Sequence, residues 1–354
     1  MTYKAAVAGL KLGGGKAVII GDARTQKSPE LLLSFAKAVD HMGGRYITAE
    51  DVGMSVKDID LIRTVTNHAV GGSNEGGSGD PSVMTAFGVF QGMKAAMKHA
   101  GLGEKLEGVR VAIQGVGNVG YHLASYLCAA GAKLLVTDIY PNQVERVVTE
   151  FGAVSVSPDA IYSVDCDVFA PCALGAILNL RTIPQLKCKI VAGSANNQLE
   201  EPNTDGELLQ NRGIVYAPDY AINSGGLINV AAELDGYDSK RVLDKVSLIY
   251  NTIDDILHCS KKESILPHKA ADRLAEQHLE TMRKQNATNR EQWVQNANAC
   301  LGQPVVASAT KSHLRFNTVY SELLCPHCRQ KVLSGVGFRW GTLGNLRYKP
   351  GDLI

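Results

Sequence analysis

The stretch that decides the fold is Val109-Arg-Val-Ala-Ile-Gln-Gly-Val-Gly-Asn-Val-Gly120. Its first six residues are mostly apolar and β-branched, which predicts a buried strand. A Gly-x-Gly-x-x-Gly turn follows and leads into a helix predicted over 118–130. The next apolar run, 133–137, ends in Asp138 and completes a βαβ unit.

In this context each glycine of the turn has a physical role. Gly115 permits the tight turn, Gly117 lets the backbone approach a pyrophosphate, and Gly120 permits close packing of helix on strand. An acid placed like Asp138 accepts from a ribose 2′-hydroxyl and would repel a 2′-phosphate, which favours NAD over NADP. The alternative is a glycine-rich turn with no ligand. The candidate cofactor contacts here are Gly115, Val116, Gly117, Asn118, Val119, Gly120 and Asp138.

Short apolar runs and helical patterns alternate through most of the chain, which predicts an α/β fold with a parallel sheet covered by helices on both faces. We expect further strands at 17–20, 46–49, 168–170, 189–192 and 213–217. We expect further helices at 28–42, 55–70, 81–100, 141–151, 204–210, 240–262 and 269–285. The glycine-rich stretch 71–80 is the expected domain boundary.

Composition narrows the class of protein. The 354 residues carry 36 basic and 35 acidic side chains, and 45% are hydrophobic. Neither a disordered chain nor a basic nucleic-acid-binding protein has that balance. The first 21 residues contain no apolar run long enough for a signal peptide or a membrane span, and the cysteines before residue 287 show no paired spacing. We therefore expect a cytoplasmic protein with reduced, buried thiols and no nucleic-acid or membrane partner.

A lysine follows three glycines at Gly13-Gly-Gly-Lys16. No Ser or Thr follows it and the predicted next element is a strand, so this is not a phosphate-binding Walker loop. A lysine held in a partly desolvated cleft loses its proton more readily, and Lys4 could add like-charge repulsion. Such an amine can act as a general base. The alternative is a solvated surface lysine.

Several motifs in fixed order resemble the glutamate/leucine/phenylalanine/valine dehydrogenases, and among these leucine dehydrogenase most closely. They are Met1-Thr-Tyr-Lys4, Gly13-Gly-Gly-Lys16, Thr48-Ala-Glu-Asp-Val-Gly53, Gly115–Gly120, Pro171-Cys-Ala-Leu-Gly-Ala176, Ala195-Asn-Asn-Gln-Leu199 and Ala217-Pro-Asp-Tyr-Ala-Ile-Asn-Ser-Gly-Gly-Leu-Ile-Asn-Val230. The match runs from Met1 to about Lys284.

The resemblance implies that Lys16 is the catalytic lysine, which activates the water that attacks the imine carbon, and that Asp51 is its proton-transfer partner. By itself an acid placed like Asp51 is more often a turn or cap residue. The remaining implied roles are as follows. The substrate α-carboxylate is bound by Lys4, the substrate is oriented by Asn223, its side chain is faced by Ala49, Leu227 and Val230, and the cofactor is contacted by Thr85, Ala173 and Asn197.

The implied reaction is oxidative deamination of an L-amino acid by NAD, in a homo-oligomer and without a metal. The apolar pocket positions favour a branched aliphatic substrate over glutamate, whose carboxylate would need a polar partner. One methylene changes binding by only ~1 to 3 kcal/mol, so leucine, valine and isoleucine are not separated.

The implied domains are a shortened catalytic domain over 1–79, a Rossmann-type NAD-binding domain over 80–266, a helix at 267–286 that packs back on the catalytic domain, and an atypical tail at 287–354, for which disorder is one interpretation. Family members begin before the first motif, so the resemblance implies a catalytic domain whose N-terminal part is missing. An alternative function follows, that of a catalytically impaired dinucleotide-binding subunit of a hetero-oligomer.

The tail differs from the rest of the chain. It carries eight basic and three acidic residues and both tryptophans. Cys325-Pro-His-Cys328 has the spacing of a zinc knuckle, but a structural site needs four ligands and only His313 and His327 stand nearby. A solvated or misassigned extension is the favoured interpretation.

Overall fold

The computed structural model describes residues 1–73 and 76–301. Residues 1–277 form one compact unit, and a second unit begins at His278. The sheet and the site residues discussed below all belong to the first unit.

Six parallel strands form the main sheet, in the order β5-β4-β3-β6-β7-β8. From β3 the chain moves outward to β4 and β5, and it then returns to pair β6 with the other side of β3. Ligands of doubly wound sheets bind at the carboxyl ends of strands beside such a reversal. The predicted parallel α/β fold is confirmed. The bounds are β3 (Arg110–Gln114), β4 (Lys133–Thr137), β5 (Val154–Ser155), β6 (Val168–Pro171), β7 (Ile190–Val191) and β8 (Val215–Tyr216).

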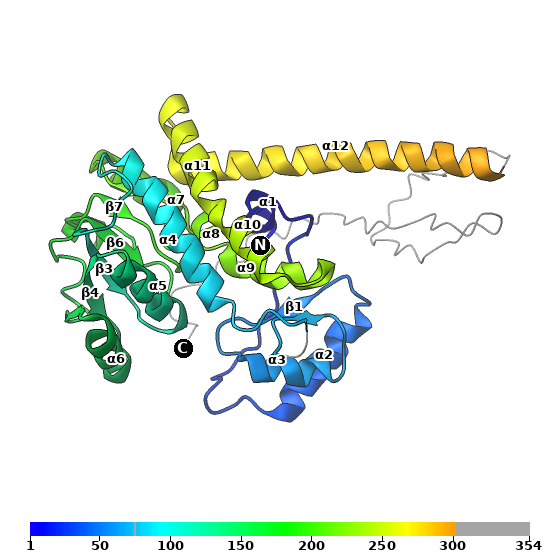
Figure 1. The fold of residues 1–354 in the computed structure, drawn as a ribbon, viewed down its shortest axis with the longest axis horizontal. Coiled ribbons are helices and arrows are strands. Elements are labelled where there is room, and N and C mark those ends of the chain that lie inside the picture. Colours follow the sequence, from blue (N-terminus) through cyan, green and yellow to red (C-terminus); the bar gives the residue numbers. More distant parts are fainter. Residues whose placement is uncertain (74–75, 302–354) are drawn as a thin grey trace. The chain divides into compact units, whose positions relative to one another are not determined.

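Helices connect these strands and cover the sheet (Figure 1). The crossovers are α5 (Asn118–Ala129), α6 (Pro141–Phe151), the 3-10 turn η1 (Ile183–Gln185) and α7 (Pro202–Asn211). The long helix α4 (Ser82–His99) packs against both α5 and α11 (Ile249–Glu263). Gly88 and Gly92 make the packing against α11 close, because a Cβ at Gly88 would lie 2.6 Å from Ile249 and one at Gly92 would lie 3.1 Å from Ile253.

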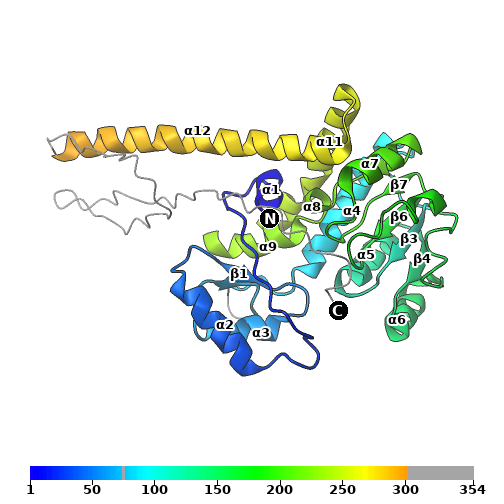
Figure 2. The ribbon, with the colours of Figure 1, turned by 180° about the vertical axis from the view of Figure 1, so that it is seen from behind.

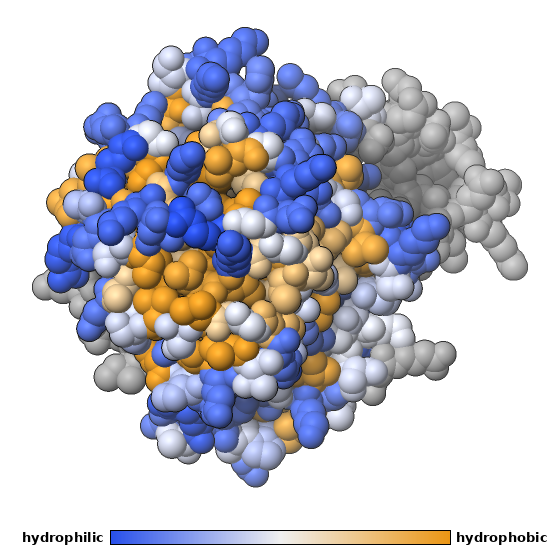
Figure 3. Space-filling model, turned by 60° about the vertical axis from the view of Figure 1, so that its left-hand side comes forward, coloured by the Kyte–Doolittle hydropathy of each residue, from blue (hydrophilic) through white to orange (hydrophobic). Residues whose placement is uncertain are grey.

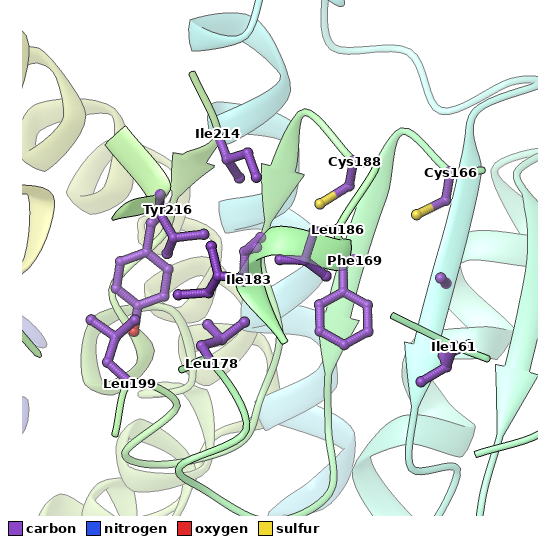
Figure 4. Close-up of a cluster of buried hydrophobic side chains, with 13 residues drawn as sticks. Ile161, Cys166, Phe169, Leu178, Ile183, Leu186, Cys188, Leu199, Ile214 and Tyr216 are labelled. Carbon is purple, nitrogen blue, oxygen red and sulfur yellow. The ribbon is translucent and has the colours of Figure 1, made fainter. Parts of the chain in front are cut away.

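One face of the sheet is buried by a single hydrophobic cluster (Figure 4). Phe169 of β6 lies within it and is fully buried, and Ile183 and Leu186 around η1 pack over the strands. Cys166 and Cys188 lie just before β6 and β7 in the same cluster. The sheet therefore has a continuous apolar support beneath β6 and β7.

The first 70 residues form α1 (Thr2–Val7), α2 (Pro29–His41), β1 (Thr48–Ala49), α3 (Val56–Arg63) and β2 (Ala69–Val70). Ser28 caps α2, and Ser55 with Asp58 forms a capping box on α3. Leu32, Ala36, Ile59, Ile62 and Ala69 make a small core between these elements. The two short strands β1 and β2 pair in parallel as a sheet of their own.

Two predictions in this region are wrong. The expected strand at 17–20 is not a strand: its apolar residues are exposed, Ile20 by 93%, and no described strand pairs with it. The expected helix at 55–70 ends at Arg63, since the chain turns there so that Ala69 and Val70 can pair with β1. Residues 17–20 find no strand to pair with among the described residues, whereas Ala69 and Val70 do pair, with β1. In both places the conformation depends on whether a distant segment is available for pairing.

The chain after the sheet is helical, as Figure 2 shows from behind. Its elements are α8 (Asp219–Ile222), α9 (Gly225–Ala231), the 3-10 turn η2 (Ala232–Asp235), α10 (Ser239–Ser247), α11 and α12 (Pro267–Leu301). The single helix expected at 240–262 is two helices that break at Leu248. The break lets α10 pack against α9 while α11 packs against α8 and α4.

The structure also bears on the expectations about membrane spans and cysteines. In the part of the chain that the structure describes, no helix is long and apolar enough to cross a bilayer. Five described cysteines are free thiols, but only Cys166 and Cys188 are buried, so the expectation of burial is wrong for Cys128, Cys172 and Cys259. The CxxC pair and its histidines lie outside the described residues.

Candidate functional site

The glycine turn lies at the strand-order reversal, and its geometry separates the three glycines. Gly115 has φ +91°, a conformation that L side chains rarely adopt, and a Cβ there would lie 2.7 Å from Ala173. At Gly120 a Cβ would overlap the carbonyl oxygen of Gly115. At Gly117 it would meet only Gln143 Oε1, at 3.7 Å. Two glycines thus serve internal packing, and the middle one leaves open space.

Asp138 holds the turn from the end of β4. Its carboxylate accepts from the backbone N–H of Val116 at 2.8 Å and from that of Tyr140 at 3.0 Å. The first residues of α5, Asn118 and Val119, follow the turn, and no side chain caps this helix N-terminus. Unpaired N–H groups at a helix start, beside a glycine without a Cβ, fit a pyrophosphate. The residues present therefore suit a dinucleotide.

Buried polar atoms without partners surround the same edge of the sheet. They include Gln114 Oε1 at the end of β3, Thr137 Oγ1 at the end of β4 and Asn223 Oδ1 after α8. Buried polar groups of proteins are nearly always hydrogen-bonded, so each such atom calls for an explanation. These three atoms place unsatisfied polar groups beneath the edge where the glycine turn lies, although protein atoms cover them in this structure.

Lys16 and Asp51 form an ion pair within the first 70 residues, the segment that contains α1 to β2. Asp51 follows the end of β1, and the side chains are 51% and 45% exposed, so a small molecule can reach both. Partial burial lowers the pKa of the Lys16 ammonium. A lysine with a lowered pKa beside a carboxylate can both take up and hand on a proton.

The glycines before Lys16 allow the backbone to pack closely against neighbouring segments. A Cβ on Gly14 would overlap Thr2, and one on Gly15 would lie 2.7 Å from the ring of Tyr46. The glycine run therefore seats Lys16 against the start of α1, the helix that carries Lys4.

Lys4 lies on α1 between two charges. Burial lowers the pKa of its ammonium to about 8, the carboxylate of Asp219 opposes this shift, and Lys16 adds to it. Asp219 accepts from the backbone N–H of Gln198 at 3.0 Å. Asn223 donates to Ser194 O and to Asn196 Oδ1, so α8 and the residue after it hold the loop that carries Asn197. The structure thus joins the lysines to the predicted cofactor loop through α8.

Of the residues predicted to face the substrate side chain, Val230 of α9 lies close to the ends of β1 and β2. Val230 is buried, and its Cγ1 lies 3.6 Å from the position of a Cβ on Gly71; Glu50, next to Ala49, flanks the same position. Thr85 lies against Gly226 of α9, where a Cβ would overlap its hydroxyl. Leu227 is half-buried on α9.

Three acids of this region were not singled out from the sequence. Glu233 is 5% exposed and accepts from Gly71 N, Ser78 N and Ser78 Oγ at 2.5–2.7 Å. Glu50 has an unpartnered buried oxygen, and burial raises its pKa to about 7, with Asp80 and Asp58 adding to the effect. Asp219 stands within a quoted motif, but only the contacts across the fold reveal its place. In the described residues, no group of three or more His, Cys, Asp and Glu is arranged to hold a metal.

A doubly wound parallel sheet with a glycine turn at its reversal places the chain in the class of Rossmann-type oxidoreductases. Comparison with known proteins identifies the family. The model of the Glu/Leu/Phe/Val dehydrogenase dimerisation domain matches residues 1–68, and that of the Glutamate/Leucine/Phenylalanine/Valine dehydrogenases matches residues 76–140 and 136–312. The chain belongs to the Glu/Leu/Phe/Val dehydrogenase family. This confirms the family that the motifs indicated. The match continues to residue 312, so the expectation that the resemblance ends at about Lys284 is wrong.

Individual relatives agree with this assignment. Leucine dehydrogenase of Geobacillus stearothermophilus is 55% identical over 285 residues, which are 80% of this chain and 77% of that protein. Leucine dehydrogenase of Bacillus subtilis is 52% identical over 304 residues, 86% of this chain and 82% of that protein. The crystal structure of L-tryptophan dehydrogenase from Nostoc punctiforme superposes with a TM-score of 0.68 at 43% identity, over 80% of this chain and 81% of that one.

Proposed function

We propose that this chain catalyses the NAD-dependent oxidative deamination of a branched-chain aliphatic L-amino acid to the 2-oxo acid and ammonium. The observation that carries the proposal is the ion pair of Lys16 and Asp51, together with the partly buried Lys4, whose pKa Lys16 helps to lower. Those side chains supply a base, a proton carrier and a fixed positive charge for a carboxylate. The relatives called leucine dehydrogenase support the choice of substrate.

The chain's own residues divide the work as follows. The Lys4 ammonium binds the substrate carboxylate, and Asn223 orients the substrate. NAD, when bound, accepts the hydride from the α-carbon. Neutral Lys16 then takes a proton from the water that attacks the imine carbon, and Asp51 carries the proton onward. The roles of Lys16 and Asp51 require the pair to remain open to substrate, as it is.

We assign the dinucleotide to the glycine turn, with Gly115 to Gly120, Asp138, Ala173, Thr85 and Asn197 as its contacts. Asp138 favours NAD because its carboxylate would repel a 2′-phosphate. One cation does lie near Asp138: Arg24 Nη1 is 3.4 Å from Tyr140 Oη. Arg24 is far from Asp138 in the sequence, so the residues next to Asp138 give no sign of it. Both oxygens of Asp22 bind Arg24, which offsets its charge.

The pocket favours an aliphatic substrate for two reasons. Ala49 and Val230 are apolar, and Leu227 lies on the same helix as Val230. Glu50 lies beside the same glycine, Gly71, as Val230 does. A glutamate substrate in this pocket would therefore bring a second carboxylate close to the carboxyl group of Glu50.

We further propose a homo-oligomer. Hydrophobic residues gather on one face of the molecule and are bordered by hydrophilic ones (Figure 3), a pattern that marks interaction surfaces. The match to a dimerisation domain over residues 1–68 supports the same conclusion.

The test is NADH formation by the purified chain with L-leucine, compared with L-glutamate and with the Lys16→Ala variant. Leucine-dependent NADH formation that Lys16→Ala abolishes supports the proposal. A folded chain that binds NAD without leucine turnover would instead support the impaired subunit, and its native mass would then show whether it is a monomer awaiting a partner.

A further inference from the structure

Two tyrosines attach separate short helices to the same face of α12. Tyr3 of α1 donates to Glu276 Oε1 at 2.9 Å, and Tyr220 of α8 donates to Asp272 Oδ1 at 2.7 Å. Asp272 and Glu276 are four residues apart on α12, so they share one face of that helix. The two phenol–carboxylate bonds therefore act from one rigid support.

The residues beside these tyrosines belong to the candidate site. Tyr3 precedes Lys4 in the chain, and Tyr220 follows Asp219, the carboxylate whose charge acts on Lys4. The helices α1 and α8 also contact each other directly. Fixing both tyrosines thus fixes the helix that carries the amine and the helix that carries its counter-charge.

Neither helix can hold its own position. The helix α1 has six residues and no side-chain N-cap, and α8 has four residues. Isolated helices shorter than about 12 residues are marginal in water. Their placement must come from tertiary contacts, and only Ala5, Ala6 and Val7 of α1 are buried. The position of the other end of α1, which carries Tyr3 and Lys4, therefore depends on polar contacts such as the Tyr3–Glu276 hydrogen bond.

The bond of Tyr220 is the more buried of the two. Burial raises the pKa of Asp272, while the bond from Tyr220 lowers it, so the tyrosine stabilises the charged carboxylate. Burial and the bond to Asp272 both raise the pKa of Tyr220, which keeps its proton for donation. The Tyr3 bond lies closer to solvent.

We propose that Tyr3 and Tyr220 are positioning residues: by binding α1 and α8 to one face of α12, they hold the Lys4 ammonium where it receives the substrate carboxylate. This inference rests on the proposed function. Neither tyrosine touches the reacting atoms, so their loss affects binding of the carboxylate before it affects the chemical step.

The variants Tyr3→Phe and Tyr220→Phe remove the hydroxyls and keep the rings. A hydrogen bond to a charged acceptor is worth roughly a tenfold change, less where solvent replaces it. We expect Tyr220→Phe to raise the KM for leucine about tenfold and Tyr3→Phe to raise it about threefold. The inhibition constant of isocaproate, which keeps the carboxylate and lacks the amine, rises in parallel. The kcat and the KM for NAD stay within about twofold.

A matched control exists in the same unit. Tyr250 of α11 donates to Glu104 Oε1 at 2.6 Å, and Tyr250→Phe removes an equivalent bond that involves neither α1 nor α8. This variant should leave both carboxylate readouts unchanged. Thermal unfolding of all three variants shows whether each is folded at the assay temperature.

Isocaproate inhibition unchanged in Tyr220→Phe overturns the inference, as does an equal rise in the KM for NAD, which would indicate general distortion. Where the wild-type chain turns over leucine and the variants behave like Tyr250→Phe, only the positioning role fails. A folded wild-type chain that neither turns over leucine nor binds isocaproate overturns the proposed function and this inference together.

Discussion

Replacing two glycines of the turn, one at a time, should separate cofactor binding from stability. A Cβ on Gly117 meets nothing closer than Gln143 Oε1 at 3.7 Å, and its φ of −66° suits alanine. A Cβ on Gly120 overlaps the carbonyl oxygen of Gly115 and lies 2.9 Å from its carbonyl carbon. Those atoms are backbone and cannot rotate away, so the turn itself must move.

The magnitudes follow from these distances. Overpacking of this kind costs about 1–3 kcal/mol, and each kcal/mol lowers the thermal midpoint by roughly 1–2 °C in a protein of this size. We expect that loss for Gly120→Ala and almost none for Gly117→Ala. At Gly117 the new methyl group instead keeps a pyrophosphate from the backbone, and losing a charge-assisted hydrogen bond of about 1.5–3 kcal/mol weakens NAD binding roughly tenfold to a hundredfold.

The assays are thermal unfolding without ligand and calorimetric titration with NAD. Gly117→Ala serves as the stability control for Gly120→Ala, since both changes add one methyl group to the same turn. If Gly117→Ala keeps both its thermal midpoint and its NAD affinity, the backbone at this position does not face the pyrophosphate, and the cofactor assignment is wrong.

Three further outcomes are expected. The kcat at saturating leucine rises with pH through an apparent pKa below 10.5, because partial burial lowers the pKa of Lys16 and its neutral amine is the base; a pH profile of kcat that is flat up to that value contradicts this. Glu233→Gln destabilises the chain by about 1.5–3 kcal/mol in denaturant unfolding, since a buried charged acceptor of three hydrogen bonds is lost, and an unchanged midpoint would refute it. Asp138→Asn raises the NADP-to-NAD ratio of kcat/KM by about tenfold, because the repulsion of a 2′-phosphate is removed; an unchanged ratio argues against a ribose contact.

The long elements could be predicted because their signals are local. The apolar spacing of α4, α5 and α6 and the strands around the glycine turn match the structure to within a residue or two. The strands outside the centre of the sheet could not be bounded in this way. β1, β2, β7 and β8 have two residues each, and whether a short apolar run becomes a strand depends on a neighbour to pair with. The run at 17–20 has the composition of a strand and no partner in the described residues.

The candidate site likewise contains residues with a local sequence signal and residues whose surroundings depend on distant contacts. The glycine turn is visible in sequence because its roles lie within about 25 residues of chain, from Gly115 to Asp138. Glu233 bonds residues 155 and 162 positions earlier in the chain, and no local pattern announces such a contact. The environment of Lys4 likewise depends on Asp219, far along the chain. Sequence identifies the residue type at such positions, and the fold supplies the environment that sets its chemistry.

Two lysine–aspartate pairs near the N-terminus show why that environment matters. Lys27 pairs with Asp58 at 2.6 Å much as Lys16 pairs with Asp51, over a similar separation in sequence. Asp58 also accepts from Ser55 N and Ser55 Oγ in the capping box of α3, and its side chain is only 16% exposed. The carboxylate of Asp58 is thus occupied by hydrogen bonds that stabilise the start of α3. Among the described residues, the Asp51 carboxylate accepts one further hydrogen bond, from the backbone N–H of its neighbour Val52, and its side chain stays 45% exposed. Of these two similar pairs, that of Lys16 is therefore the one that we propose for proton exchange with a substrate.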